Sequence, residues 1–322
     1  MQSLNKVTSV RLRKWLRVSA IAGCVVWEVG FFWRSSLLVE TELINKILLL
    51  GVLVIVPLGL TIAARDQIEE TLFTFRLAAY AQPLGAIAVV ISFLLEQGIA
   101  AAVLASVWLV VTGLMALHGL VRLAAQNGRS IEEISVSAGL IFASVGGGWL
   151  VMSRFGIQPL GFGDTIVLLT AVHFHYAGFA APILAGMAGR TLGRELSFAR
   201  RLLMFIVTGI IAGVPMVAAG ITLSPVLGLI GTIIISLALI LLSVVLIGWI
   251  IPNVAKRGAQ VLLLVSSFAP LISMVLASLY AYSIVTKKLI IDIPQMAMSH
   301  GIINAFGFAL CGLMGWAIIR SE

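Results

Sequence analysis

Long runs without charged residues constrain this chain more than any other feature. Ten stretches of about twenty residues are almost free of charge, and about twenty apolar residues are what a helix needs to cross the hydrocarbon core of a bilayer. A soluble fold would need a polar surface, which a chain with 61% apolar and only 11% charged residues cannot supply. We therefore predict an all-α, polytopic integral membrane protein.

The connections between the runs are short, so no loop can house a soluble domain. We predict a single transmembrane domain over residues 1–322. Its expected spans lie near residues 18–33, 47–64, 77–95, 98–121, 134–153, 164–188, 202–222, 226–250, 259–283 and 295–319.

The lysines and arginines predict the orientation. If the N-terminus is cytoplasmic, sixteen of the 21 basic residues lie on the inner side and five on the outer side. Cytoplasmic loops carry an excess of lysine and arginine. We expect a multi-pass protein of the cell (inner) membrane with both termini in the cytoplasm.

The net charge of +8 does not indicate a nucleic-acid partner. The basic residues lie in short clusters between apolar runs, whereas binding to phosphates needs a continuous basic surface. The expected partners are the lipid bilayer and a small molecule or proton. The sequence leaves the oligomeric state open.

Glu28 is the one acidic residue deep inside a predicted span. A carboxylate there is costly unless it is protonated, paired or in contact with water. It could bind a proton or a cation. It could equally be a protonated acid bonded to a neighbouring helix, or lie near the outer interface.

All four histidines also fall in predicted spans: His118, His173, His175 and His300. Imidazole can carry a proton, bind a metal or donate to a substrate. For any single histidine, a hydrogen bond between helices is the simpler interpretation. For the set, we favour a site.

His173 and His175 are two positions apart, which is about 200° around a helix, so we expect them to face different neighbours. His173 shares a face with Tyr176. Pro182 removes a backbone donor and crowds the carbonyl of Gly178, which favours a kink just beyond the histidines.

The tenth span has a polar face of its own, because His300 and Asn304 are four residues apart. If the sixth and tenth helices touch, they would form one substrate- or proton-binding site. Its candidate residues are His173, His175, Tyr176, His300 and Asn304, with Glu28 as a possible coupling carboxylate. His118 lies near the cytoplasmic end of its span and is not expected to join them.

No cofactor is required by the sequence, although a metal or haem remains possible. Candidate metal ligands are His173, His175 and His300. No zinc, di-iron or dinucleotide signature occurs. Glycines 146–148 lie within a span, where we interpret them as a close-packing patch rather than a phosphate loop.

Two short blocks carry a family resemblance: LTAVHFHYAGF at 169–179 and SHGIINAFGF at 299–308. With these blocks the chain resembles the YndJ-like family of bacterial multi-span membrane proteins. The resemblance implies an inner-membrane protein, sometimes described as transporter-like. It assigns no role to any residue.

These features favour a transporter or permease-like protein with a histidine-lined site between the sixth and tenth helices. Two alternatives stay open. One is a membrane enzyme that uses the same histidines, either a metal or haem oxidoreductase or an acid-base enzyme acting on a lipophilic substrate. The other is a structural or sensory protein in which the histidines only join helices. We lean against an enzyme.

Overall fold

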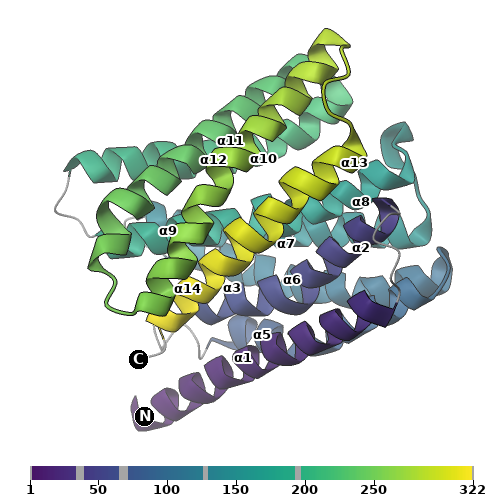
Figure 1. The fold of residues 1–322 in the computed structure, drawn as a ribbon. Coiled ribbons are helices and arrows are strands. Elements are labelled where there is room, and N and C mark those ends of the chain that lie inside the picture. The colour runs from purple at the N-terminus through teal and green to yellow at the C-terminus, as the bar shows by residue number, and fades with distance from the viewer. Residues whose placement is uncertain (1, 34–39, 65–71, 126–129, 193–196, 321–322) are drawn as a thin grey trace. The chain divides into compact units, whose positions relative to one another are not determined.

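The computed structural model describes residues 2–33, 40–64, 72–125, 130–192 and 197–320, without the side chains of residues 2–9, 31–33, 40, 41 and 197. This part of the chain is built from helices and contains no strand (Figure 1). Nine of its helical segments are long and apolar enough to cross a membrane. They coincide with the second to tenth predicted spans, which confirms the all-α, multi-span fold class.

The first predicted span, 18–33, lies within α1 (Gln2–Trp33) but is not one of these nine segments. The side chains of residues 31–33 fall outside the description, so the span is only partly covered. Its described outer face carries exposed apolar residues, among them Val18, Ile21 and Val25.

Contacts divide the chain into two compact units, and each is described by itself. The first unit contains residues 1–127 and 137–179. Besides α1 it holds α2 (Glu40–Leu50), η1 (Gly51–Ile55), α3 (Val56–Ala63), α5 (Phe73–Leu94), α6 (Ile99–Ala125), most of α7 (Ile131–Phe155), η2 (Pro159–Gly161) and α8 (Asp164–His173). Within it, α5 packs along α6, and α1 packs on η1 and α3.

The second unit contains residues 128–136 and 180–322. It holds the start of α7 together with α9 (Ala181–Leu192), α10 (Ser197–Leu223), α11 (Pro225–Val245), η4 (Leu246–Ile250), η5 (Ile251–Asn253), α12 (Arg257–Thr286), α13 (Ile293–Met296), η6 (Ala297–Gly301), η7 (Ile303–Leu310) and α14 (Cys311–Ile319). In sequence order, α10 packs on α11, α11 on α12, and α12 on η7 and α14 (Figure 1). The single-domain organisation stays a prediction.

Several spans contain π-helical segments, in which the backbone hydrogen bonds skip one residue more than in an α-helix. Three of them end two residues before a proline: η1 before Pro57, η3 (Phe174–Ala180) before Pro182, and η4 before Pro252. Proline has no N–H to give to the carbonyl four residues earlier, so the ladder changes register there. The interruption predicted near Pro182 is therefore present as the π-helix η3, which begins earlier than predicted, at Phe174, and includes His175.

Arg154 shows how a buried charge is accommodated in this fold. Its guanidinium donates from Nη2 to the carbonyl oxygens of Ser92 (3.1 Å) and Leu95 (2.8 Å), at the end of α5. The Phe93 ring lies 4.6 Å from the guanidinium carbon. A helix C-terminus carries unpaired carbonyls and partial negative charge, which stabilise this cation although no described residue gives it an acidic partner.

Candidate functional site

His175 lies in the first unit and is completely buried. The indole Nε1 of Trp108 donates to its Nε2 over 2.9 Å, and its Nδ1 lies 2.8 Å from the carbonyl oxygen of Ala171. Because an indole N–H can only donate and a carbonyl can only accept, the ring is neutral with its proton on Nδ1. Both ring nitrogens are therefore in use, and a metal or a second proton would have to displace Trp108.

Close packing holds this histidine in place. A Cβ added at Gly146 would approach His175 Nδ1 to 2.7 Å, and one at Gly51 would meet the Tyr176 ring at 3.3 Å. The Tyr176 hydroxyl donates to the carbonyl oxygen of Ile47 at 2.8 Å. A Cβ at Gly147 would also collide with Thr112. The interpretation of glycines 146–148 as a packing patch is thus supported at its first two positions.

His173 has different surroundings from His175, as the spacing predicts. It is the last residue of α8 and is only partly buried, with its ring 5.6 Å from that of Phe174 in an edge-to-face contact. The π-helix η3 begins at the next residue. The two histidines therefore occupy two environments of the first unit.

His300 anchors a second polar cluster, in the second unit. Its Nδ1 lies 2.8 Å from the carbonyl oxygen of Ser273 on α12, so Nδ1 carries the proton. Asn304 accepts from the Ser273 hydroxyl at 3.1 Å and donates to the His300 carbonyl oxygen at 2.8 Å. His300 Nε2 is then a lone-pair acceptor, and it has no hydrogen-bond partner among the described residues.

The backbone around His300 is π-helical, and no proline in the same segment explains this geometry. η6 and η7 together cover most of residues 297–310, yet no proline follows them, unlike η1, η3 and η4. The facing helix α12 has Pro270 in its interior, one turn before Ser273. Because π-helical segments often occur at functional sites, this backbone supports His300 and Asn304 as candidate site residues.

The two remaining titratable candidates, Glu28 and His118, both belong to the first unit and have contacts of their own. Glu28 is exposed on α1, and the thiol of Cys24 donates to its Oε1 over 3.7 Å. His118 is buried, with Nδ1 3.0 Å from the hydroxyl oxygen of Thr74 and its ring against Phe75. A coupling role for Glu28 stays a prediction.

The structure brings His175 and Tyr176 together in one unit and His300 and Asn304 in the other. One joint site built from both sets stays a prediction. Among the described residues no three His, Cys, Asp or Glu side chains are grouped as metal ligands.

Sequence reasoning missed Trp108 and Ser273, which set the tautomers of the two histidines. Ser273 gave a partial signal, because it follows Pro270 by one turn in a span. No such signal was present for Trp108, since tryptophan is common in apolar runs. Both contacts join segments far apart in the chain, and the pattern of one helix does not reveal its partner.

Exposed apolar side chains on long helices, such as Leu84 at 68% and Phe205 at 74% exposure, are unsuited to water. With the nine candidate spans they define a polytopic helical membrane protein. The chain belongs to the YndJ-like protein family, which matches residues 46–308 and so confirms the resemblance of the two histidine blocks.

A relative in Bacillus subtilis (strain 168), the uncharacterized membrane protein YndJ, is 33% identical over 216 residues. The match covers 66% of this chain and 38% of the relative, so the matched part spans well under half of that protein's length. No solved structure matches the chain.

Proposed function

We propose that this chain is a permease-like membrane protein whose solute- or proton-binding group is His300. The observation that carries the proposal is the unpartnered Nε2 of His300 in a ring whose tautomer is fixed by Ser273. A neutral imidazole held in this way can accept a hydrogen bond from a solute or take up a proton. Asn304, bonded to the same Ser273, holds its amide beside the ring.

The same reasoning gives His175 a structural role. With Trp108 and Ala171 on its two nitrogens, it has no group left for a solute. Buried polar groups in membrane proteins are paired in this way to join helices. We therefore assign the main binding group to the tenth span rather than the sixth. From the sixth span, the partly exposed His173 is the histidine that remains a candidate.

The membrane and the orientation belong to the same proposal. The excess of basic residues on alternate segments supports a cell (inner) membrane protein with both termini in the cytoplasm. Glu28, exposed on α1, would couple transport to a cation only if a partner from outside this unit reaches it.

His300→Asn is the sharpest test, because asparagine can keep the donor to the Ser273 carbonyl and lacks the Nε2 acceptor. We expect uptake into proteoliposomes of the transported solute, sought among protons, amino acids, carboxylates, amines and sugars, to fall about tenfold or more, the effect of one strong hydrogen bond. The thermal midpoint in detergent should stay close to that of the unmodified protein.

His300→Gln serves as the matched variant, because it loses the Ser273 contact and should lower the thermal midpoint. The proposal fails if none of these solute classes is taken up by the unmodified protein. It also fails if His300→Asn transports normally.

The prediction that the sixth and tenth helices share the site can be tested by cross-linking. In a protein with Cys24 and Cys311 replaced by serine, we expect cysteines introduced at His173 and His300 to be joined by a short bifunctional maleimide in membranes. A pair at His118 and His300 should not be joined, because the sequence places His118 near the other end of its span. Equal yields from both pairs would contradict the prediction.

A further inference from the structure

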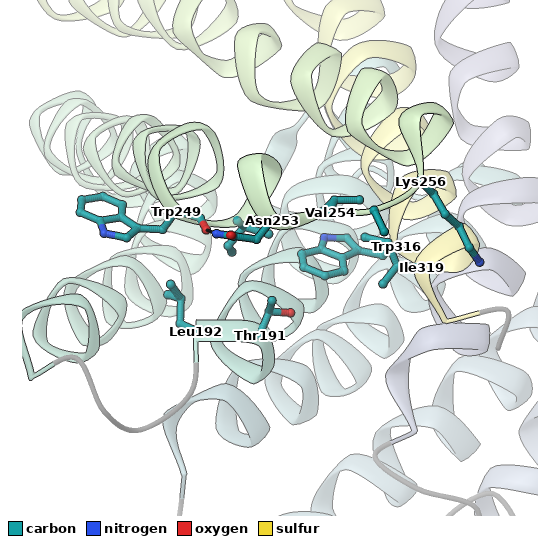
Figure 2. Close-up of a pocket in the computed structure, with 10 residues that line it drawn as sticks. Thr191, Leu192, Trp249, Asn253, Val254, Lys256, Trp316 and Ile319 are labelled. Carbon is teal, nitrogen blue, oxygen red and sulfur yellow. Dashed lines mark hydrogen bonds between the residues drawn. The ribbon is translucent and has the colours of Figure 1, made fainter.

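The second unit contains a pocket that the proposed transport site does not use. It has a volume of about 470 Å³ and lies where helix ends meet. Leu192 ends α9, Trp249 and Asn253 lie in η4 and η5, Lys256 precedes α12, and Trp316 and Ile319 are in α14. In Figure 2, Trp316 lies between Asn253 and Trp249 on one side and Lys256 and Ile319 on the other. Such a volume suits a small ligand or a lipid head group.

Trp316 carries a buried hydrogen-bond donor that has no acceptor in the described part of the chain. Its side chain is 1% exposed, and its indole N–H has no hydrogen-bond partner among the described residues. Buried tryptophan N–H groups nearly always find an acceptor. Because this ring lines the pocket, the missing acceptor is best supplied by a pocket ligand.

The other polar groups of the pocket are also mainly donors. Trp249 is 38% exposed, and its indole N–H likewise lacks a partner within the described chain. Lys256 donates from Nζ to the Ile318 carbonyl oxygen at 2.9 Å, which fixes its ammonium at the end of α14. Asn253 uses one amide proton on the Trp249 carbonyl oxygen, at 2.8 Å.

The charge of the pocket and its position at the ends of the spans indicate the chemical class of the ligand. The pocket has one cationic side chain and no acidic one, so it favours an anion. Its residues come from the ends of spans, where tryptophan and lysine commonly meet lipid head groups. The basic-residue count places these same ends on the cytoplasmic side, which faces the anionic lipids.

We propose that this pocket binds an anionic phosphate ester with an apolar tail. The phosphate would accept from the Trp316 and Trp249 indoles and pair with Lys256, while Leu192, Ile250 and Ile319 contact the apolar part. This chemistry could come from a bilayer phospholipid or from a soluble phosphate ester.

Binding can be measured by native mass spectrometry of the full chain in detergent with added phosphatidylglycerol. We expect Trp316→Phe and Lys256→Gln each to weaken binding about fivefold, the effect of one charged contact at a membrane surface. Trp316→Phe removes a donor that has no partner among the described residues and leaves only the cavity of the smaller ring, so we expect it to lower the thermal midpoint modestly and to stay folded. This keeps the test valid even if Lys256→Gln, which loses the Ile318 contact, folds poorly.

Lys288→Gln is the control, because Lys288 is exposed at the opposite end of α12 and should not affect binding. A soluble ester with a short apolar chain, hexyl phosphate, distinguishes the sources: binding as tight as that of phosphatidylglycerol indicates a soluble ester, and weaker binding indicates a lipid. Glycerol 3-phosphate has no apolar tail, and its equally tight binding would contradict the proposed contact with the tail. Equal binding of phosphatidylcholine and phosphatidylglycerol would overturn the proposal. So would unchanged binding by Trp316→Phe.

Discussion

Replacing Glu133 by alanine is expected to lower the free energy of unfolding by about 3 to 5 kcal/mol, because it removes one member of a largely buried ion pair. Glu133 lies in the first turn of α7 and is 3% exposed, and Arg190 in the last turn of α9 is 13% exposed. The guanidinium donates twice, from Nε over 2.9 Å and from Nη2 over 2.8 Å. Denaturation by sodium dodecyl sulfate in mixed micelles would measure the loss.

The close approach of the two helices explains why this pair is enclosed. A Cβ at Gly186 would come within 2.8 Å of the Glu132 carbonyl oxygen, and one at Gly189 within 2.8 Å of the Glu132 side chain. Small residues let membrane helices approach in this way. The Ser135 hydroxyl adds a bond of 2.7 Å to the Pro182 carbonyl oxygen.

Two variants make the Glu133 experiment decisive. Glu132→Ala removes the neighbouring carboxylate outside the ion pair and should change stability by less than about 0.5 kcal/mol. The double variant Glu133→Leu with Arg190→Met removes both charges, so it should recover most of the loss. If Glu133→Ala were as stable as Glu132→Ala, the ion pair would not contribute to the fold.

Replacing His175 by alanine is expected to cost about 3 to 5 kcal/mol, because it opens a cavity in a packed region and leaves the Trp108 N–H without an acceptor. Gly146 and Gly51 have no side chains with which to refill the space. Near-ultraviolet circular dichroism and the detergent unfolding midpoint would record the change.

A double-mutant cycle with Trp108→Phe separates the hydrogen bond from the cavity. We expect a coupling energy of about 1 to 3 kcal/mol between the two positions, since each single change removes one partner of the same hydrogen bond. The alternative, in which His175 is the transported-proton carrier, makes the opposite prediction. His175→Ala would then retain its stability and lose transport, which would refute the structural role.

The positions of the spans could be predicted because a bilayer imposes a one-dimensional requirement. Each crossing needs about twenty apolar residues, wherever its neighbours lie. Nine helices of the described chain are long and apolar enough to cross a membrane, and their ends lie within a few residues of the predicted bounds. The separate surroundings of His173 and His175 also followed from helical geometry, which is local.

The roles of the polar residues could not be predicted in the same way. His175 and His300 look alike in sequence, each a histidine inside an apolar run. One has Trp108 on its Nε2, and the other has no partner there in the described chain. The pocket lined by Trp316 and Lys256 was missed for the same reason, because these two residues are sixty positions apart in the sequence.

By itself, the sequence determined the class of protein and its family, because the long apolar segments and the two histidine blocks can be identified from the order of residues along the chain. Only the tertiary structure decided which polar groups are paired. Hydrogen bonds such as that from Trp108 to His175 join residues 67 positions apart. Whether a buried donor or acceptor is satisfied therefore depends on a neighbouring helix, and helix packing is not encoded in the pattern of any one span.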